Sequence, residues 1–314
     1  TTGIIKRVRT VTEGGTVSDY DKEEVKRKFS IQSSVIPLEV DGVKVNLLDT
    51  PGFFDFSGEV YEALSVADGA IIVINGKSGV EVGTRKSFDF CAKRGIPVIV
   101  YITCVEDEHV DASAIIDELR ESYGNKIVPF HMPMKEGTEF KGFINAAKML
   151  ECRLQPNGTY YEKEVEEGVN DELDEYRQQL MEGVAETSEE LMEKFFETME
   201  LTPAEIAKGL KAGVREGTVA PVLCGAALSG LGVEMLLETI VDLVPLATDM
   251  PAEKAEDEDG KEVTVAIDPN GTTAAIVFKT LSDQYGKYSL VKVVRGKITP
   301  DMSLYDTTTG NTEK

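Results

Sequence analysis

The sequence lacks long apolar runs, and it contains few cysteines and histidines. No run of about 18 or more apolar residues occurs, and the opening TTGIIKRVRT lacks the apolar segment of a signal peptide. The four cysteines (Cys91, Cys104, Cys152 and Cys224) are widely spaced, and only two histidines accompany them. This spacing argues against a zinc site or a disulfide framework. We therefore expect a soluble protein of the reducing cytoplasm with no membrane partner.

Basic residues are also scarce. The chain has 33 Lys and Arg against 56 Asp and Glu, a net charge of −23, so any contact with nucleic acid is expected to be local. Between Glu151 and Glu200, 16 acidic residues stand against 4 basic ones. We interpret this segment as a solvated helical face, with an acidic interaction surface as the alternative.

The patterns that are present indicate an α/β domain. Residues 35–50, VIPLEVDGVKVNLLDT, contain two β-rich runs joined by Asp41-Gly42, a strong hairpin signal. Three continuous apolar runs are typical of parallel strands buried on both faces; they span residues 69–76, 95–103 and 219–227. Helical patterns lie in three stretches, 58–67, 82–94 and 112–123. The predicted fold is a mostly parallel sheet with one antiparallel edge.

The length of 314 residues is sufficient for about two domains. The strand and helix alternation stops after about residue 128 and resumes near 219, so we interpret residues 129–218 as a subdomain inserted into a domain of residues 1–128 and 219–246. Residues 247–270 are polar and charged, which is typical of a linker or a mobile loop. Residues 271–314 predict the opening strands of a β-barrel that they are too few to close.

Candidate site residues lie where strands of the sheet domain end. Ligands bind at the carboxyl ends of strands in open α/β sheets, and Asp49, Thr103 to Glu106 and Gly225 to Leu228 fall there. In nucleotide sites a strand-terminal Asp holds magnesium, and a following glycine lets a backbone N–H approach a phosphate. Asp49 and Gly52 have this spacing. A purely structural turn is an equal alternative on this motif alone.

Several segments together resemble elongation factor G and its tetracycline-resistance relatives, the translational GTPases. The segments are KRKFSI, LLDTPGFFDFSGEV, ADGAIIVINGKSGVEVGTRK, AETSEELMEKFFE and PVLCGAALSGLGVEMLLETIVDLVP. The separation of 54 residues between Asp49 and Thr103 also matches the family's spacing between its Asp-x-x-Gly and Asn-Lys-x-Asp motifs. The resemblance implies a P-loop GTPase-type domain with an inserted α+β subdomain and a translation-factor β-barrel. It also implies a monomer that binds GTP or GDP with Mg²⁺ and has the ribosome, its RNA and its proteins, as partner.

The resemblance assigns roles to three groups of residues. The magnesium and γ-phosphate motif falls on Asp49, Thr50, Pro51 and Gly52. Ser30 falls at the position of the switch threonine that also ligates magnesium. The loop whose backbone N–H binds the guanine oxygen falls on Ala226, Ala227 and Leu228.

The guanine-recognition motif departs most from the family pattern. The family's Asn-Lys-Met-Asp is replaced by Thr103, Cys104, Val105 and Glu106. Glu106 can meet the guanine edge only after its carboxylate shifts by about 1.5 Å, one methylene, and Cys104 lacks the lysine stem that covers the base. We expect weakened guanine affinity or selectivity. A shift of register to Asp107 or Glu108 is a less favoured alternative.

A phosphate loop is not found in the chain. Gly76-Lys77-Ser78 resembles the end of one, but Ile71 stands where a glycine is required. In the family the loop would lie about a dozen residues before Thr1. We interpret the chain as a fragment that lacks this loop and most of the second domain, and we predict that the chain as given does not hydrolyse GTP.

Phe53 stands where the family usually has a catalytic histidine that helps to position the attacking water. A phenyl ring cannot make that hydrogen bond, so Phe53 either shields the γ-phosphate or marks lost catalysis. The adjacent Phe54 is expected to pack the switch region.

Two functions remain open. The first is a GTP-dependent translation factor that acts on the ribosome, in translocation or in protection against a ribosome-bound drug. The second is a paralogue that has lost hydrolysis and serves as a ribosome-binding or regulatory module. An NAD-dependent oxidoreductase is disfavoured because no G-x-G-x-x-G follows the first strand. His109 and His131 lack a plausible nucleophile partner, so we interpret them as surface or hydrogen-bonded core histidines.

Overall fold

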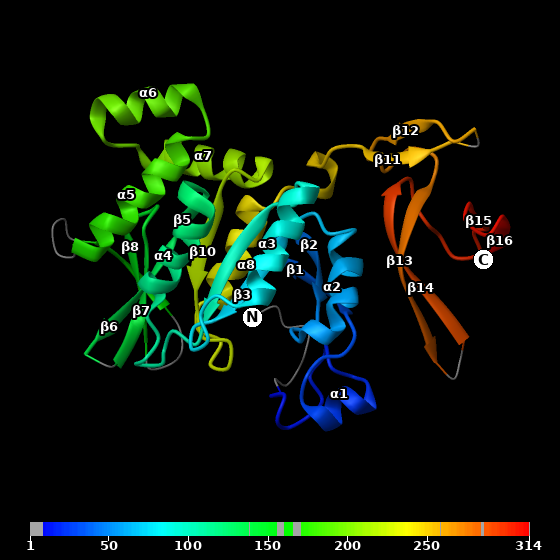
Figure 1. The fold of residues 1–314 in the computed structure, drawn as a ribbon, viewed down its shortest axis with the longest axis horizontal. Helices are drawn as coiled ribbons and strands as arrows, with labels where there is room; N and C mark the ends of the chain where they lie inside the picture. The colour runs from blue at the N-terminus through cyan, green and yellow to red at the C-terminus, as the bar shows by residue number, and fades with distance from the viewer. Residues whose placement is uncertain are drawn as a thin grey trace. The chain divides into compact units, whose positions relative to one another are not determined.

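The computed structural model describes residues 9–137, 139–155, 160–165, 171–257, 259–283 and 286–313. The opening segment TTGIIKRV, residues 1–8, lies outside the described residues. The chain divides into two compact units (Figure 1). Unit 1 comprises residues 1–60 and 69–244, and unit 2 comprises residues 61–68 and 245–314.

A parallel sheet forms the core of unit 1. Its strands lie in the order β3 (Ala70–Asn75), β4 (Val98–Thr103), β10 (Ala220–Cys224) and β5 (Ile127–Pro129). Every residue of β10 and all but the last of β4 are buried, as expected for apolar strands covered on both faces. Helices α3 (Val82–Arg94), α4 (Ala112–Tyr123) and α8 (Val233–Leu243) belong to the same unit. The predicted α/β class with a parallel sheet is confirmed.

The predicted hairpin consists of β1 (Ser34–Val40) and β2 (Val43–Asp49). Asp41 and Gly42 both have positive φ, 49° and 77°, as a type I′ turn requires. Among the described residues this hairpin is a two-stranded sheet of its own rather than an edge of the parallel sheet. No described strand hydrogen-bonds the outer edge of β3, where the side chain of Val73 is 60% exposed.

Three short elements flank the hairpin. Helix α1 (Lys22–Arg27) precedes it, and the 3-10 helix η1 (Phe54–Phe56) and helix α2 (Ser57–Leu64) follow it. Helix α1 begins with a capping box, in which the Asp21 side chain and the Glu24 side chain each accept a hydrogen bond from the backbone at the other's position. This box orders the start of a helix that is otherwise too short to be stable alone.

The described residues of the interval 129–218 form an antiparallel sheet and three helices. The sheet has the order β6 (His131–Glu136), β7 (Glu139–Asn145), β8 (Leu150–Leu154) and β9 (Tyr160–Glu164). The helices are α5 (Asp171–Ala185), α6 (Glu189–Thr198) and α7 (Pro203–Glu216). Phe130 joins this sheet to the parallel one: its N–H donates to Val222 O at 2.9 Å, and its carbonyl accepts from Ala146 N at 3.1 Å. The strand β5 therefore continues into β6 across both sheets.

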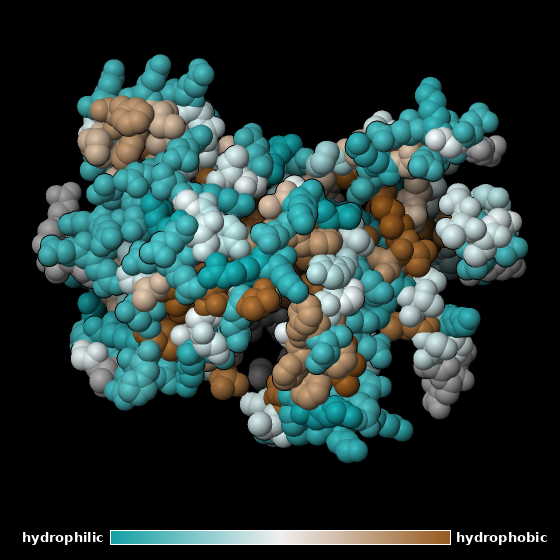
Figure 2. Space-filling view, in the orientation of Figure 1, coloured by the Kyte–Doolittle hydropathy of each residue, from teal (hydrophilic) through white to brown (hydrophobic). Residues whose placement is uncertain are grey.

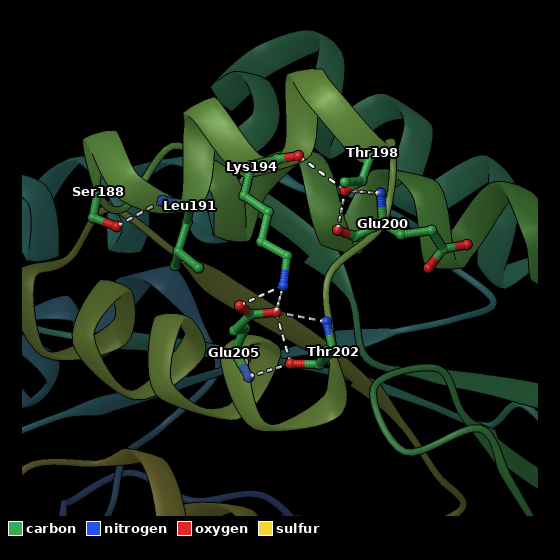
Figure 3. A network of polar contacts seen from close by, with 7 residues as sticks. All are labelled: Ser188, Leu191, Lys194, Thr198, Glu200, Thr202 and Glu205. Carbon is green, nitrogen blue, oxygen red and sulfur yellow. Dashed lines mark hydrogen bonds and ion pairs between the residues drawn. The ribbon is translucent and has the colours of Figure 1, made fainter.

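Helices α6 and α7 are joined by an ion pair that Figure 3 shows. Lys194 Nζ lies 2.6 and 2.7 Å from the two carboxylate oxygens of Glu205, and Thr202 caps α7 through Glu205 N. The bonds from Lys194, and then from Thr202, lower the pKa of Glu205 to about 2. On the outer side of α6, Phe196 and Met199 are 73% and 57% exposed, and Figure 2 shows an apolar area over this helix at the upper left.

Unit 2 is built from hairpins. They are β11 (Glu253–Glu256) with β12 (Glu262–Val265), β13 (Ala274–Asp283) with β14 (Gly286–Arg295), and β15 (Leu304–Asp306) with β16 (Asn311–Glu313). The 3-10 helix η3 (Ala247–Asp249) precedes them, and η2 (Gly124–Lys126) lies in unit 1. The first hairpin lies within residues 247–270, where the composition predicts a linker or mobile loop. Three of its charged residues, Lys254, Glu256 and Glu262, occupy exposed strand positions. No helix among the described residues is long and apolar enough to cross a membrane.

Candidate functional site

The predicted site residues lie on three loops that follow β2, β4 and β10. We call residues 103–110 the β4 loop and residues 225–232 the β10 loop. Because β4 and β10 are adjacent and parallel, their carboxyl ends and both loops lie side by side. The third loop begins at Asp49, in the separate hairpin.

Hydrogen bonds join the β4 loop to the β10 loop. Gly225 N donates to Ile102 O at 2.9 Å, and Val105 N donates to Gly225 O at 3.3 Å. Thr103 Oγ1 accepts a long bond of 3.4 Å from Ala227 N. Thr103 therefore ties the β4 loop to the β10 loop.

The β4 loop has a strained start and a fixed middle. Cys104 has φ +64°, a left-handed conformation that is unusual for a residue other than glycine, and the next residue, Val105, is completely buried. Asp107 accepts a bond from His109 N at 3.0 Å and pairs with Lys77 at 2.5 Å. The bond from Lys77 lowers the pKa of Asp107. Glu106 is exposed at the surface of the loop.

Lys77 is a member of this site that sequence reasoning missed. It lies in the Gly76-Lys77-Ser78 segment, which the sequence pattern marks only as a false phosphate loop. The segment follows β3, and β3 is the other neighbour of β4, so its ammonium reaches the β4 loop. The Asp107 carboxylate therefore already has two partners, Lys77 and His109 N. These contacts account for an aspartate at this position without a role in binding guanine.

The backbone N–H groups of the β10 loop differ in their hydrogen bonding. Ala226 N donates to Leu231 O at 2.9 Å, and Leu231 N donates back to Ala226 O at 3.1 Å. Within the described part of the chain, Ala227 N makes only the long bond to Thr103, and Leu228 is 85% exposed. Of the predicted backbone donors, Ala227 N is thus better suited than Ala226 N to bind an incoming oxygen.

Glycine is required at the start of the β10 loop. A Cβ at Gly225 would lie within hard contact of Tyr101 and 2.7 Å from Leu231 O. Tyr101 Oη itself donates to Leu231 O at 3.4 Å. The close approach of two backbone segments and a ring therefore fixes where this loop leaves the sheet.

The Asp49 site gathers oxygen atoms from segments distant in the sequence. Asp49 is half-buried, and burial raises its pKa, while a hydrogen bond from Ser18 opposes the shift and Asp19 and Glu24 add to it. Ser30 Oγ donates to Asp19 Oδ1 at 2.7 Å. The predicted pair Ser30 and Asp49 is therefore linked through Ser18 and Asp19, and sequence reasoning missed Asp19.

The oxygen atoms around Asp49 are suitable ligands for a magnesium ion. A serine hydroxyl that gives its hydrogen to Asp19 keeps its lone pairs, and carboxylate and hydroxyl oxygens are the ligands of a hard cation. Among the described residues, no group of three or more His, Cys, Asp and Glu side chains is arranged to hold a metal ion. Magnesium is commonly bound by one or two carboxylates together with water and phosphate oxygens, so it does not need such a group.

Buried and half-buried carboxylates hold the segment that carries Ser30. Glu24 is 2% exposed, and its carboxylate accepts bonds from Ile31 N at 2.9 Å and Gln32 N at 3.0 Å. Glu59 accepts from Ser33 N at 2.6 Å and from the Ser33 hydroxyl at 2.9 Å. The signal for Glu24 in the sequence is its place in the capping box, three residues after Asp21.

The turn after Asp49 exposes both a glycine and two phenyl rings. A Cβ at Gly52 would meet nothing within 4 Å, so its backbone faces open space. Phe53 is 55% exposed and packs edge-on against Phe29, with ring centroids 4.7 Å apart. Phe54 was expected to pack the switch region. It is instead 58% exposed, with the Lys86 ammonium 3.9 Å from its ring centroid, because a cation–π contact can cover a ring without burying it. The neighbouring Thr50 and Pro51 are half-buried and buried.

The side chains of the two histidines have opposite surroundings. The side chain of His109 is 85% exposed, as the surface interpretation requires. His131 is 1% exposed, and among the described residues its Nδ1 has no hydrogen-bond partner. The interpretation as a hydrogen-bonded core histidine is therefore wrong for that atom, because the rings of Phe130 and Phe143 surround it.

Comparisons with known proteins agree with this arrangement. Residues 1–246 match the family described as the elongation factor Tu GTP binding domain. The chain is 31% identical over 297 residues to an elongation factor G-like protein from Thermotoga maritima, covering 94% of this chain and 43% of that protein. It is 27% identical over 321 residues to elongation factor G from Granulibacter bethesdensis, covering all of this chain and 46% of that protein.

A solved structure has the same fold. A crystal structure of a protein from Thermus thermophilus, 31% identical in sequence, matches with a TM-score of 0.82 over 97% of this chain and 43% of that one. The chain thus spans less than half the length of each of these proteins. It belongs to the family of elongation factor Tu GTP-binding domains, and its similarity to the elongation factor G proteins is confirmed.

Proposed function

We propose that this chain is the guanine-nucleotide-binding part of an elongation factor G-like translation factor that acts on the ribosome in the cytoplasm. The observation that carries the proposal is the pairing of the β4 loop with the β10 loop at adjacent carboxyl ends, where Ala227 N makes a long bond to Thr103. A guanine oxygen can replace the threonine oxygen on that N–H. The proposed division is a GTPase domain of 1–128 and 219–246, an inserted subdomain of 129–218, and a linker of 247–270 before an incomplete barrel of 271–314.

In this proposal the Asp49 site is the magnesium and phosphate end. Asp49 and Ser30 hold Mg²⁺, which neutralises phosphate charge, and Asp19 orients the Ser30 hydroxyl. The open space at Gly52 allows its backbone N–H to approach the γ-phosphate. Burial of Asp49 strengthens its interaction with a cation, because water screens the charges less.

The base end is proposed to be weakened but guanine-selective. Glu106, exposed on the β4 loop, is the acceptor for the guanine edge in place of the family's aspartate. Cys104 gives the base less apolar cover than a lysine stem, and Thr103 replaces an amide. We expect binding that still prefers GTP to ATP, because only guanine offers donors to Glu106 and an oxygen acceptor to Ala227 N.

A ribosome-binding assay tests the proposal. The full-length protein is sedimented with ribosomes in the presence of a non-hydrolysable GTP analogue, GDP, a non-hydrolysable ATP analogue, or no nucleotide. We expect the largest bound fraction with the GTP analogue, because γ-phosphate contacts at Gly52 and Ser30 order the switch segments. Equal sedimentation under all four conditions would contradict a nucleotide-dependent action on the ribosome.

A second candidate function is a module that binds ribosomes without hydrolysing GTP. The observation that favours it is the contact of Phe53 with Phe29, since the ring at the position of the family's catalytic histidine packs against another ring. The substitution Phe53→His separates the two candidates. Ribosome-stimulated GTP turnover that rises in this variant indicates an enzyme impaired at one group. Turnover that is absent in both the parent and the variant supports the binding module.

A further inference from the structure

The two edge strands of the β6–β9 sheet each hold one of the proposed base-binding loops. Lys135, on β6, donates from Nζ to Asp107 O at 2.8 Å and to Val110 O at 3.1 Å. Tyr160, the first residue of β9, accepts from Gly232 N at 2.9 Å. The β4 loop and the β10 loop are therefore both attached to the same inserted sheet, at its opposite edges.

The position of Lys135 is fixed by the strands on which it lies and with which it pairs. Its strand β6 continues β5 of the parallel sheet, so its position is tied to the core. Met134 pairs with Gly142 of the neighbouring strand β7, and Lys135 pairs with Phe140. Lys141 has no partner in this register and forms a β-bulge. Bulges change the direction of neighbouring side chains. The half-buried Lys135 donates to two carbonyls of the β4 loop, and Asp107 O also accepts from Val110 N at 3.2 Å.

The β10 loop is held in a similar way at its other end. Gly232 has φ +77° and is the N-cap of α8, so its N–H is not used by the helix ladder. Tyr160 Oη is the acceptor for this N–H. The ring of Tyr160 lies 6.4 Å from that of Phe143, and Phe143 is completely buried in the same sheet. The hydroxyl is thus held by a rigid neighbour.

A hollow of about 660 Å³ borders the second half of the β4 loop. Side chains of the loop and of the inserted sheet line this hollow, among them Glu108, Val110, Met134, Lys135 and Ile144. The two bonds from Lys135 tie Asp107 and Val110 to the inserted sheet, in addition to the Lys77 ion pair and the bonds within the loop.

We propose that Lys135 and Tyr160 are positioning residues through which the inserted sheet sets the affinity and base selectivity of the nucleotide site. The inference rests on the proposed function. A loop that is already ordered loses less entropy when a ligand binds, so removing a restraint weakens binding. The effects of the two residues differ. Lys135 holds the loop that carries Glu106, which contacts the guanine amino group, and Tyr160 holds the loop that carries Ala227, which contacts the base oxygen.

The experiment compares guanine and hypoxanthine nucleotides on the full-length protein. Hypoxanthine keeps the base oxygen and lacks the 2-amino group. We expect Lys135→Met to weaken GDP binding by about tenfold and IDP binding less, so that the GDP to IDP ratio falls. We expect Tyr160→Phe to weaken both by a similar factor of about ten, with the ratio unchanged. Lys135→Arg is expected to restore part of the ratio.

The matched control is Lys141→Met, which removes an ammonium from the same sheet. Lys141 pairs with Glu136 and Glu139 rather than with the loops, so both affinities are expected to stay at the parent values. The thermal midpoint of each variant is measured to show that the fold is kept. Parent-like affinities and ratios in Lys135→Met and Tyr160→Phe would overturn the inference.

Hydrogen exchange separates failure of this inference from failure of the proposed function. If the parent binds no guanine nucleotide, the proposed function fails. Exchange in the free protein still decides whether the sheet restrains the loops. Faster exchange of amides 104–110 in Lys135→Met and of the Gly232 amide in Tyr160→Phe supports the restraint. Parent-like exchange at both places overturns it, whether or not nucleotide binds.

Discussion

Replacing the buried His131 should change how the stability of the protein depends on pH. The side chain is 1% exposed, and burial, with a smaller effect of Lys148, lowers its pKa from 6.5 to about 3. The folded protein therefore keeps this histidine neutral at pH values where the unfolded chain protonates it. The unfolded state binds more protons, so the contribution of His131 to the free energy of unfolding falls as pH drops below 6.5.

The size of the effect follows from the separation of the two pKa values. Each pH unit between 6.5 and about 3 costs about 1.4 kcal/mol of unfolding free energy. At pH 5 the loss relative to neutral pH is about 2 kcal/mol. The variant His131→Phe keeps an aromatic ring beside Phe130 and Phe143. It removes the titrating group and the Nδ1 that has no described partner.

Urea unfolding of the parent and of His131→Phe is measured at pH 7.5, 6.5, 5.5 and 5.0. Unfolding is followed by circular dichroism at 222 nm, because the chain contains no tryptophan. Helices α3 to α8 belong to unit 1 together with His131, so the helical signal reports on the relevant unit. The unfolding free energy of the parent is expected to fall more steeply below pH 6.5 than that of the variant. Parallel pH profiles for the two proteins would refute the reasoning.

Two other substitutions test the packing of the site. Gly225→Ala places a Cβ in hard contact with Tyr101 and should reduce the unfolding free energy by about 1–3 kcal/mol. Gly83→Ala, whose Cβ meets nothing within 4 Å, is the matched control, and equal urea midpoints for both variants would argue against the close approach. Glu24→Ala removes the acceptor of Ile31 N and Gln32 N and should speed tryptic cleavage between residues 22 and 33 by about tenfold. Glu23→Ala on the exposed side of the same helix is the control, and equal cleavage rates would show that Glu24 does not hold the segment.

Strong local patterns predicted most of the sheet. The Asp41-Gly42 turn and strands β3, β4 and β10 are determined by residues adjacent in the sequence. They can therefore be predicted without knowledge of the tertiary structure. The strand β5 was missed because it has only three residues, Ile127–Pro129, and no alternation to detect. The β11–β12 hairpin was missed because its strands are short and charged, as exposed strands often are.

The candidate site was predicted in part for a similar reason. Asp49, Gly52 and the β4 and β10 loops follow strands directly, and strand ends can be located from the sequence. Asp19 and Lys77 were missed because their partners, Ser30 and Asp107, are brought to them by tertiary structure. Whether these residues bind nucleotide stays a prediction, and so do the domain boundaries.

Calorimetric titration of the full-length protein with nucleotide and Mg²⁺ tests the central claim most directly. Four titrants are compared: GTP, GDP, ATP and xanthosine triphosphate. We expect binding of GTP and GDP, with ATP bound at least about tenfold more weakly, because adenine offers no oxygen to Ala227 N and presents its amino group away from Glu106. No binding of guanine nucleotides, or equal binding of GTP and ATP, would contradict a guanine-nucleotide site on these loops.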